Sequence, residues 1–227
     1  MMFLKANEIR TLDKRMILER NCPGMALMNR AGLAVAQVVA QVAAVRNERR
    51  RVTCVVGKGN NGGDALVAAR NLFESGWPVG VLMTCLPAKL EGDAREAWND
   101  LHRAGIPHLV LADEDHWEEA AGDGWDAASL PLTGIVVDGL LGTGGRGAPS
   151  GVTAAAVRWI RAARKHALVV AVDIPSGVDA DSGDVAGDAV CADITVTFAY
   201  PKTGFLNPVA QSHIGHVVVA DIGIHAD

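Results

Sequence analysis

Apolar residues recur along the chain in two alternating patterns. Short continuous runs rich in valine and isoleucine predict buried strands, and stretches with apolar residues three or four positions apart predict helices. The strand runs lie at residues 52–56, 78–85, 108–112, 134–144, 167–177, 192–199 and 216–223, of which the fourth and fifth continue into loops. The helical stretches lie at residues 6–20, 25–45, 64–76, 91–105 and 153–166, and residues 113–133 leave room for one short helix.

This order of elements predicts the fold class. The early strands are continuous apolar runs, which is typical of a parallel sheet covered on both faces. We therefore predict one α/β domain over residues 1–227, a three-layer α/β/α arrangement around a mostly parallel doubly wound sheet, with two extra N-terminal helices. No clear helix separates the late strands, so we expect the sheet to end in an irregular or antiparallel edge.

Composition narrows the class of protein. With 49% hydrophobic and 21% charged residues, the chain has ordinary globular composition. Its net charge of -5 makes it poorly suited to non-specific nucleic-acid binding, which needs Lys and Arg against phosphate. No apolar run reaches the roughly 18 residues of a membrane span, and the opening MMFLKANEIRTLDKRM carries charges where a signal peptide is apolar. We expect a cytoplasmic protein that binds no membrane.

The first stretch with unusual chemistry is GKGNNGGDA, residues 57–65, between the first strand and the next helix. Glycine permits positive φ and close approach of a ligand, and free N–H groups at a helix start favour an anion. Asn60 and Asn61 add amide groups, and Asp64 could accept from a ribose hydroxyl. The stretch is neither GxGxxG nor GxxxxGK[ST]. A plain turn in which Asp64 caps the helix is the alternative.

The second stretch is VVDGLLGTGGRG, residues 136–147, where Asp138 comes at a strand end. Backbone N–H groups, the Thr143 hydroxyl and the Arg146 guanidinium could together surround a phosphate. The alternative is a flexible turn.

The third stretch is VVAVDIPSGVDADSG, residues 169–183. A carboxylate directly after a buried strand, here Asp173, is costly unless it has a partner or a function. We interpret Asp179 and Asp181 as ordinary turn residues. Lys202, further along in AYPKTG, could equally bind a phosphate or close a surface turn.

The three stretches should meet, because ligands in open α/β sheets bind beyond the carboxyl ends of the strands. We expect Asn61, Asp138 and Asp173 to line one pocket. Asp138, Asn61, Ser176 and backbone carbonyls would form an all-oxygen cation site. With a single carboxylate, that set suits a monovalent ion better than Mg²⁺ or Ca²⁺.

The segments GNNGGDA, DGLLGTG and VDIPSGVDADSG, in this order, resemble the YjeF N-terminal family, the NAD(P)H-hydrate epimerases. The resemblance extends to CPGMALMNRAG and VTFAYPKTGFL and covers residues 6–223. It implies a Rossmann-like fold and conversion of the R to the S form of hydrated NADH or NADPH at C6 of the nicotinamide ring. It also implies one K⁺ per subunit. We expect no fused dehydratase domain, so a separate dehydratase would act downstream.

The resemblance also implies residue roles. Substrate contacts are implied for Asn60, Asn61, Gly62, Gly63, Asp64, Gly142, Thr143, Gly144, Gly145, Arg146, Gly147, Ala148 and Asp173. K⁺ would be held by Asn61, Asp138 and Ser176. Epimerisation needs a general acid or base near the C6 hydroxyl. Asp173 is the first candidate and Asp64 the second; whether burial or a nearby cation dominates their pKa stays open.

The chain departs from the family pattern at three notable positions. It has Asn29 where the family commonly has Glu, Ala65 where Gly is usual, and Gly145 where Leu is usual. If the family's Glu positions substrate, Asn29 would reduce activity.

Two rival functions stay open. A non-catalytic nucleotide- or protein-binding module of the same fold would be favoured by loss of Asp173 or of the asparagine pair, and both are present. A dinucleotide-dependent oxidoreductase is disfavoured by the missing GxGxxG pattern. The apolar second helix could supply the face of a homodimer.

Overall fold

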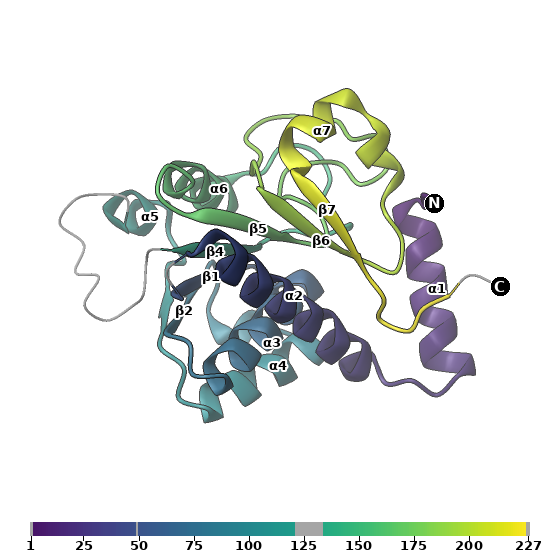
Figure 1. The fold of residues 1–227 in the computed structure, drawn as a ribbon, viewed down its shortest axis with the longest axis horizontal. Coiled ribbons are helices and arrows are strands. Elements are labelled where there is room, and N and C mark those ends of the chain that lie inside the picture. The colour runs from purple at the N-terminus through teal and green to yellow at the C-terminus, as the bar shows by residue number, and fades with distance from the viewer. Residues whose placement is uncertain (1, 49, 121–133, 226–227) are drawn as a thin grey trace.

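The computed structural model describes residues 2–48, 50–120 and 134–225 (Figure 1). Its seven strands form one sheet in the order β3-β2-β1-β4-β5-β6-β7. They are β1 Val52–Val56, β2 Val79–Met83, β3 His108–Val110, β4 Ile135–Gly139, β5 Leu168–Val172, β6 Ile194–Phe198 and β7 His216–Ala220. Because the order reverses next to β1, the sheet has a switch point between β1 and β4, where ligands bind in such folds.

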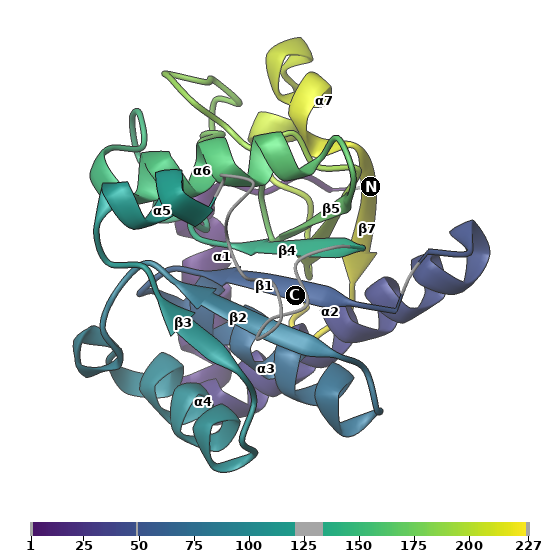
Figure 2. The same ribbon diagram turned by 90° about the vertical axis from the view of Figure 1, so that its left-hand side faces the viewer.

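Helices cover both faces of the sheet (Figure 2). They are α1 Ala6–Glu19, α2 Gly24–Arg46, α3 Asn60–Glu74, α4 Gly92–Arg103, α5 Glu114–Ala120, α6 Gly151–Ala163 and α7 Pro208–Ile214, with short 3₁₀ turns η1 Pro87–Lys89 and η2 Thr203–Leu206. Helices α2, α3 and α4 share one hydrophobic core with the sheet, and α5 and α6 share a second core on the other face. The predicted three-layer α/β/α class is therefore confirmed.

The strands are apolar on both faces because each face meets a helix layer. In β1, Val52, Cys54 and Val56 belong to the core under α2 and α3, whereas Val55 belongs to the core under α6. Successive strand residues point to opposite faces, so a strand buried on both sides needs the continuous apolar run seen in the sequence.

The expected antiparallel edge is wrong. Strand β6 pairs in parallel with both β5 and β7, in a register that runs from Ile194 opposite His216 to Phe198 opposite Ala220. A parallel pair needs a crossover connection, and η2 with α7 supplies it between β6 and β7. These helices of four and seven residues are too short to show a helical period in the sequence. The short helix expected in residues 113–133 is α5, and the rest of that stretch lies outside the described residues.

Helix α2 is long and apolar enough to span a membrane by length and composition, contrary to the expectation that no segment would be. In the fold it is a core helix. Its buried residues Leu27, Val35 and Val39 pack in the core below the sheet, and Gly32 lies against the side chain of Val67 on α3. The apolar composition that makes α2 resemble a membrane span therefore reflects its packing in the core and against α3.

The glycine-rich corner after β1 differs from the predicted loop. Helix α3 begins at Asn60, so the asparagines form its first turn and Asp64 is not its cap. Its glycines are not needed for positive φ; they permit close packing. A Cβ on Gly57 would lie 2.0 Å from the Leu140 carbonyl oxygen, and one on Gly62 would lie 2.1 Å from the Gly57 carbonyl oxygen.

We predict that Gly57→Ala destabilises the fold by about 1–3 kcal/mol or more, because its methyl group overlaps the backbone of the β4 turn. The control is Gly59→Ala, two residues on, where a Cβ would meet nothing within 4 Å. Because Gly59 is the N-cap of α3, where glycine is preferred to alanine, this variant should cost about 1 kcal/mol or less, below the cost of Gly57→Ala. Urea unfolding measures both variants. Equal midpoints would show that the close contact at Gly57 does not constrain the fold.

Candidate active site

A cavity of about 850 Å³ lies along the carboxyl ends of the strands. The turn after β1, the start of α3, the turn after β4 and the residues after β5 and β6 all line it. Helix α1 adds Ile9, Arg10 and Asp13. The three stretches singled out in the sequence therefore do meet at one rim of the sheet.

Of the predicted substrate contacts, eight line this cavity: Asn60, Asn61, Asp64, Gly142, Thr143, Gly144, Gly145 and Asp173. Asn61 and Asp64, three apart on α3, share the helix face that meets it. Gly62 and Gly63 are buried instead, against the Gly57 carbonyl and the Met28 side chain.

Asp173, directly after β5, is the most constrained residue of the cavity. Its φ is +64°, a left-handed value that is uncommon outside glycine and is often retained at functional sites. Its Oδ1 accepts hydrogen bonds from the Thr197 hydroxyl and the Phe198 N–H, both at 3.2 Å. Within the described chain no recorded hydrogen bond reaches its Oδ2, so that oxygen can meet a ligand.

The ammonium of Lys202 is the third partner of Asp173 Oδ1 and forms a close ion pair with it. The Lys202 side chain has no solvent exposure, and its Nζ also donates to the Tyr200 carbonyl at 3.3 Å. A buried ammonium is stable only when it is paired and hydrogen-bonded. The structure thus rejects the alternative in which Lys202 closes a surface turn.

Two more carboxyl groups lie close to this ion pair. Burial, and then the charge of Asp173, raise the pKa of Asp13 to about 6, although Lys202 opposes the shift. Burial first, followed by the charges of Asp173 and Asp13, holds the pKa of Asp64 well above its usual range. Of the carboxyl groups beside the ion pair, Asp64 is thus strongly disfavoured as a carboxylate.

Asp138 does not line the cavity, which corrects the expectation of a pocket shared with Asn61 and Asp173. It is fully buried beneath the turn after β4. Its Oδ1 accepts from the Ser176 hydroxyl at 2.7 Å and its Oδ2 from the Ser176 N–H at 2.9 Å. Burial raises its pKa to about 6, against the bonds from Ser176.

Two of the three predicted cation ligands, Asn61 and Ser176, nevertheless contact Leu141, and Asp138 joins them through its bonds to Ser176. The Leu141 N–H donates to Ser176 Oγ at 2.9 Å, and its carbonyl accepts from Asn61 Nδ2 at 3.0 Å. The groups gathered here are one carboxylate, a hydroxyl, an amide oxygen and a backbone carbonyl. No cluster of three or more His, Cys, Asp or Glu suited to a metal occurs in the described residues. This donor set fits a monovalent cation better than zinc or a divalent ion.

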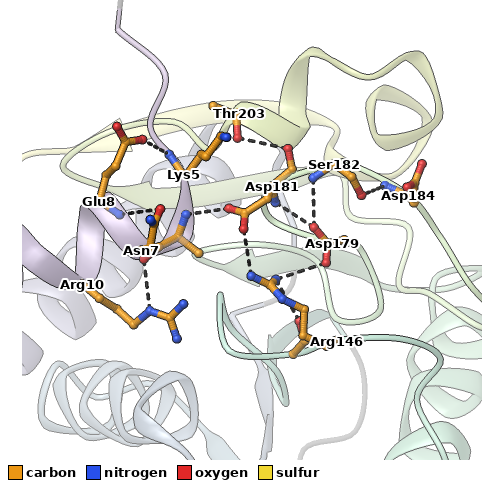
Figure 3. A network of polar contacts seen from close by, with 12 residues as sticks. Lys5, Asn7, Glu8, Arg10, Arg146, Asp179, Asp181, Ser182, Asp184 and Thr203 are labelled. Atoms are coloured by element: carbon orange, nitrogen blue, oxygen red, sulfur yellow. Dashed lines mark hydrogen bonds and ion pairs between the residues drawn. The ribbon is translucent and has the colours of Figure 1, made fainter.

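Arg146 lies outside the large cavity and faces two carboxylates instead (Figure 3). Its guanidinium donates to Asp179 Oδ2 at 3.1 Å and to Asp181 Oδ2 at 2.8 Å. Gly147 lines a smaller cavity of about 210 Å³ between this loop and residues 175–186. Ala148 is exposed and lies near Gly187.

Sequence reasoning missed Asp13 and Asp93, which both line the cavity. A signal for Asp13 existed, because Ile9, Asp13 and Ile17 are four residues apart and lie on one helix face. A carboxylate inside an apolar stripe marks a buried or functional position. No comparable pattern marks Asp93.

The Asn29 departure lies away from the cavity. Its amide oxygen accepts from Arg70 at 3.2 Å, and Arg70 also pairs with Asp100 on α4 at 2.7 Å. Asn29 therefore supports helix packing and does not position a ligand in the cavity. Ala65 places its methyl group where Gly139 leaves room.

Comparison with known proteins places the chain in a family. The family model for the YjeF-related protein N-terminus matches residues 24–204. The chain is 35% identical, over 97% of its length and 84% of the relative's, to an NAD(P)H-hydrate epimerase of Rhodopirellula baltica. It is 34% identical to an NAD(P)H-hydrate epimerase of Limosilactobacillus fermentum, over 96% of its length and 95% of that protein's.

A longer relative agrees with this placement, and a solved structure shares the fold. A bifunctional NAD(P)H-hydrate repair enzyme Nnr of Moorella thermoacetica is 39% identical over 99% of the chain, which spans only 41% of that protein. The crystal structure of yeast YNL200c superposes with a TM-score of 0.75 at 23% identity, covering 96% of this chain and 87% of the yeast one, and supports the fold. The chain belongs to the YjeF-related N-terminal family, that of the NAD(P)H-hydrate epimerases.

Proposed function

We propose that the cavity at the strand ends is the active site of an NAD(P)H-hydrate epimerase, with the hydrated nicotinamide ring between Asp173 and Asp64. The observation that carries the residue roles is the buried Asp173–Lys202 ion pair beside Asp64, whose pKa burial holds well above its usual range. The volume of about 850 Å³ is in the range of small-molecule and cofactor sites. Family membership and the names of the relatives support the reaction.

The chemistry follows from the structure of the hydrate, which carries a hydroxyl on C6 next to the ring nitrogen. Protonation of that hydroxyl lets the C6–O bond break as the nitrogen lone pair forms an iminium. Water then adds to the opposite face of C6 and loses a proton. Asp64, whose pKa is raised by burial, supplies the acid, and Asp173 Oδ2 accepts the proton from the incoming water. Lys202 fixes the Asp173 carboxylate through its other oxygen.

The test of this function is a coupled assay in which a dehydratase specific for the S form consumes hydrated NADPH. Wild-type protein should make the R form disappear. Asp173→Asn should lower kcat by about 10²–10⁴-fold, the usual contribution of general acid–base catalysis. Asp193→Asn is the matched control, since Asp193 is also a partly buried carboxylate, paired with Arg164 outside the cavity.

Asp173→Asn leaves the Lys202 ammonium buried without its carboxylate, which can cost about 3–5 kcal/mol. The double variant Asp173→Asn/Lys202→Met removes that charge and keeps the test valid if the single variant unfolds. A folded variant with wild-type kcat would exclude Asp173 from the reaction.

A second prediction concerns pH. Burial and the charges of Asp173 and Asp13 raise the pKa of Asp64, so its carboxyl group stays protonated to a higher pH than that of a free aspartic acid. We expect kcat to fall on the alkaline side, because the proton donor is then lost. Asp64→Asn should give a lower and flatter profile between about pH 6 and 10. An unchanged alkaline limb in Asp64→Asn would assign that limb to another group.

We also propose that Asp138, Ser176, Asn61 and the Leu141 carbonyl hold a K⁺ ion. The support is the all-oxygen donor set with one carboxylate. The ion would neutralise the buried Asp138 and fix the turn after β4, which lines the substrate cavity. Bound K⁺ thus has a structural effect on that turn, and the acid and base remain Asp64 and Asp173.

K⁺ should therefore raise the melting temperature. At ten to a hundred times its dissociation constant, it would stabilise the fold by about 1.4–2.7 kcal/mol, a shift of several degrees for a chain of this size. Choline at equal ionic strength controls for screening. Asp138→Asn should abolish the difference between the two salts. An equal shift with choline, or an undiminished K⁺ shift in Asp138→Asn, would refute this site.

A further inference from the structure

Asp181 contacts two parts of the chain that are far apart in sequence (Figure 3). Its Oδ1 accepts a hydrogen bond from the Ala6 N–H at 2.6 Å, and its Oδ2 accepts one from Arg146 Nη2 at 2.8 Å. Asp179 holds the same arrangement in place, because its Oδ1 accepts from the N–H groups of Asp181 and Ser182 at 2.8 and 2.9 Å, and its Oδ2 accepts from Arg146. We call Arg146, Asp179 and Asp181 the Arg146 clasp.

One end of the clasp is the start of α1. Ala6 is the first residue of that helix and is fully buried. The first N–H groups of a helix have no partner within it, and a carboxylate at this position is also favoured by the helix dipole. Asp181 therefore replaces a capping side chain from outside the helix, where Lys5 provides none of the usual cap type.

The same region contacts the segment that carries Lys202. The Thr203 hydroxyl donates to the Asp181 carbonyl at 3.1 Å. The Leu4 N–H donates to the Pro201 carbonyl, and the Thr203 N–H donates to the Leu4 carbonyl, both at 3.0 Å. The entry to α1, the Arg146 clasp and the Lys202 segment thus form one hydrogen-bonded unit.

The clasp matters for the cavity because both of its ends are cavity walls. Helix α1 presents Ile9, Arg10 and Asp13 to the cavity, and Gly144 and Gly145 line it next to Arg146. In residues 2–48, 50–120 and 134–225, the ion pairs of the clasp are the only recorded ones that link these two walls on this side of the cavity.

We propose that Asp181 is a positioning residue for the epimerase, which holds α1 and residues 142–147 after β4 (the glycine loop) at a fixed separation around the bound dinucleotide. The proposal rests on the proposed function and gives Arg146 a different role from the phosphate contact expected from the sequence. Arg146 acts through Asp181 and contacts no substrate atom.

The test compares wild type, Asp181→Asn, Arg146→Gln and the double variant. Asp181→Asn should raise KM for hydrated NADPH about tenfold and change kcat less than about threefold, since it loosens binding and leaves the reacting groups intact. Arg146→Gln should give a similar rise. The double variant should be no worse than the poorer single variant, because the two residues act as one unit. If the rise in KM of the double variant equals the product of the two single rises, Arg146 binds substrate directly and the proposal fails.

The matched control is Asp188→Asn. Asp188 has the same side-chain exposure as Asp181, 33%, and also pairs with arginine, at 2.7 Å from Arg161, but it lines neither cavity and contacts neither wall. Its variant should keep wild-type KM. A rise in KM equal to that of Asp181→Asn would overturn the proposal. If Asp181→Asn does not fold, Arg146→Gln, which leaves the Ala6 contact intact, carries the kinetic test.

Hydrogen exchange gives a readout that does not depend on activity. Amides of residues 6–13 should exchange at least about tenfold faster in Asp181→Asn than in wild type or Asp188→Asn. If wild type is inactive but the exchange pattern is as expected, the proposed function is wrong and the structural role of the clasp is supported. If wild type is active but Asp181→Asn changes neither amide exchange nor KM, the role of the clasp is wrong and the proposed function is supported.

Discussion

The structure depends on a backbone-to-backbone contact at the switch point of the sheet. The Gly57 N–H donates to the Gly139 carbonyl at 3.1 Å, and no side chain fits between Gly57 and the carbonyl of Leu140. This contact brings the start of α3 against the turn after β4. Asn61 can then reach the Leu141 carbonyl, and Ser176 can reach its N–H. A larger residue at Gly57 would separate the two turns and with them the groups that shape the cavity.

Charge balance in the cavity follows from the same crowding. Asp13, Asp64 and Asp173 share the neighbourhood of one buried ammonium, Lys202. Three ionised carboxylates around one cation would be strongly unfavourable at this burial, so at least one of them keeps its proton. Lys202 is paired with Asp173, and the pKa values of Asp13 and Asp64, for which the described residues record no ion pair, are raised. The site thus combines an ion pair with carboxyl groups whose pKa values are raised.

The sequence predicted the fold and most of the cavity, because strand ends in a parallel sheet meet at one rim and the three polar stretches all follow strands. It failed where the decisive contacts are tertiary. Whether the late strands were parallel depended on α7, which is too short to show a period. Lys202 was undecided because its burial depends on the Asp173 contact across two strands. Asp138 was placed in the cavity because the sequence shows that it follows β4 but not that Ser176 covers it.

The turn after β5 shows how one segment can satisfy two interpretations. Asp179 does make the local bonds to the N–H groups of Asp181 and Ser182 that turn residues make. Those bonds use only its Oδ1, and they aim Oδ2 of both aspartates at Arg146. The Arg146 side chain is 47% exposed. Its ion pairs with the two aspartates therefore contribute little to the free energy of unfolding and serve mainly to fix the geometry of the turn. This half-exposed contact fits the positioning role proposed for Asp181, in which a change affects substrate binding more than folding.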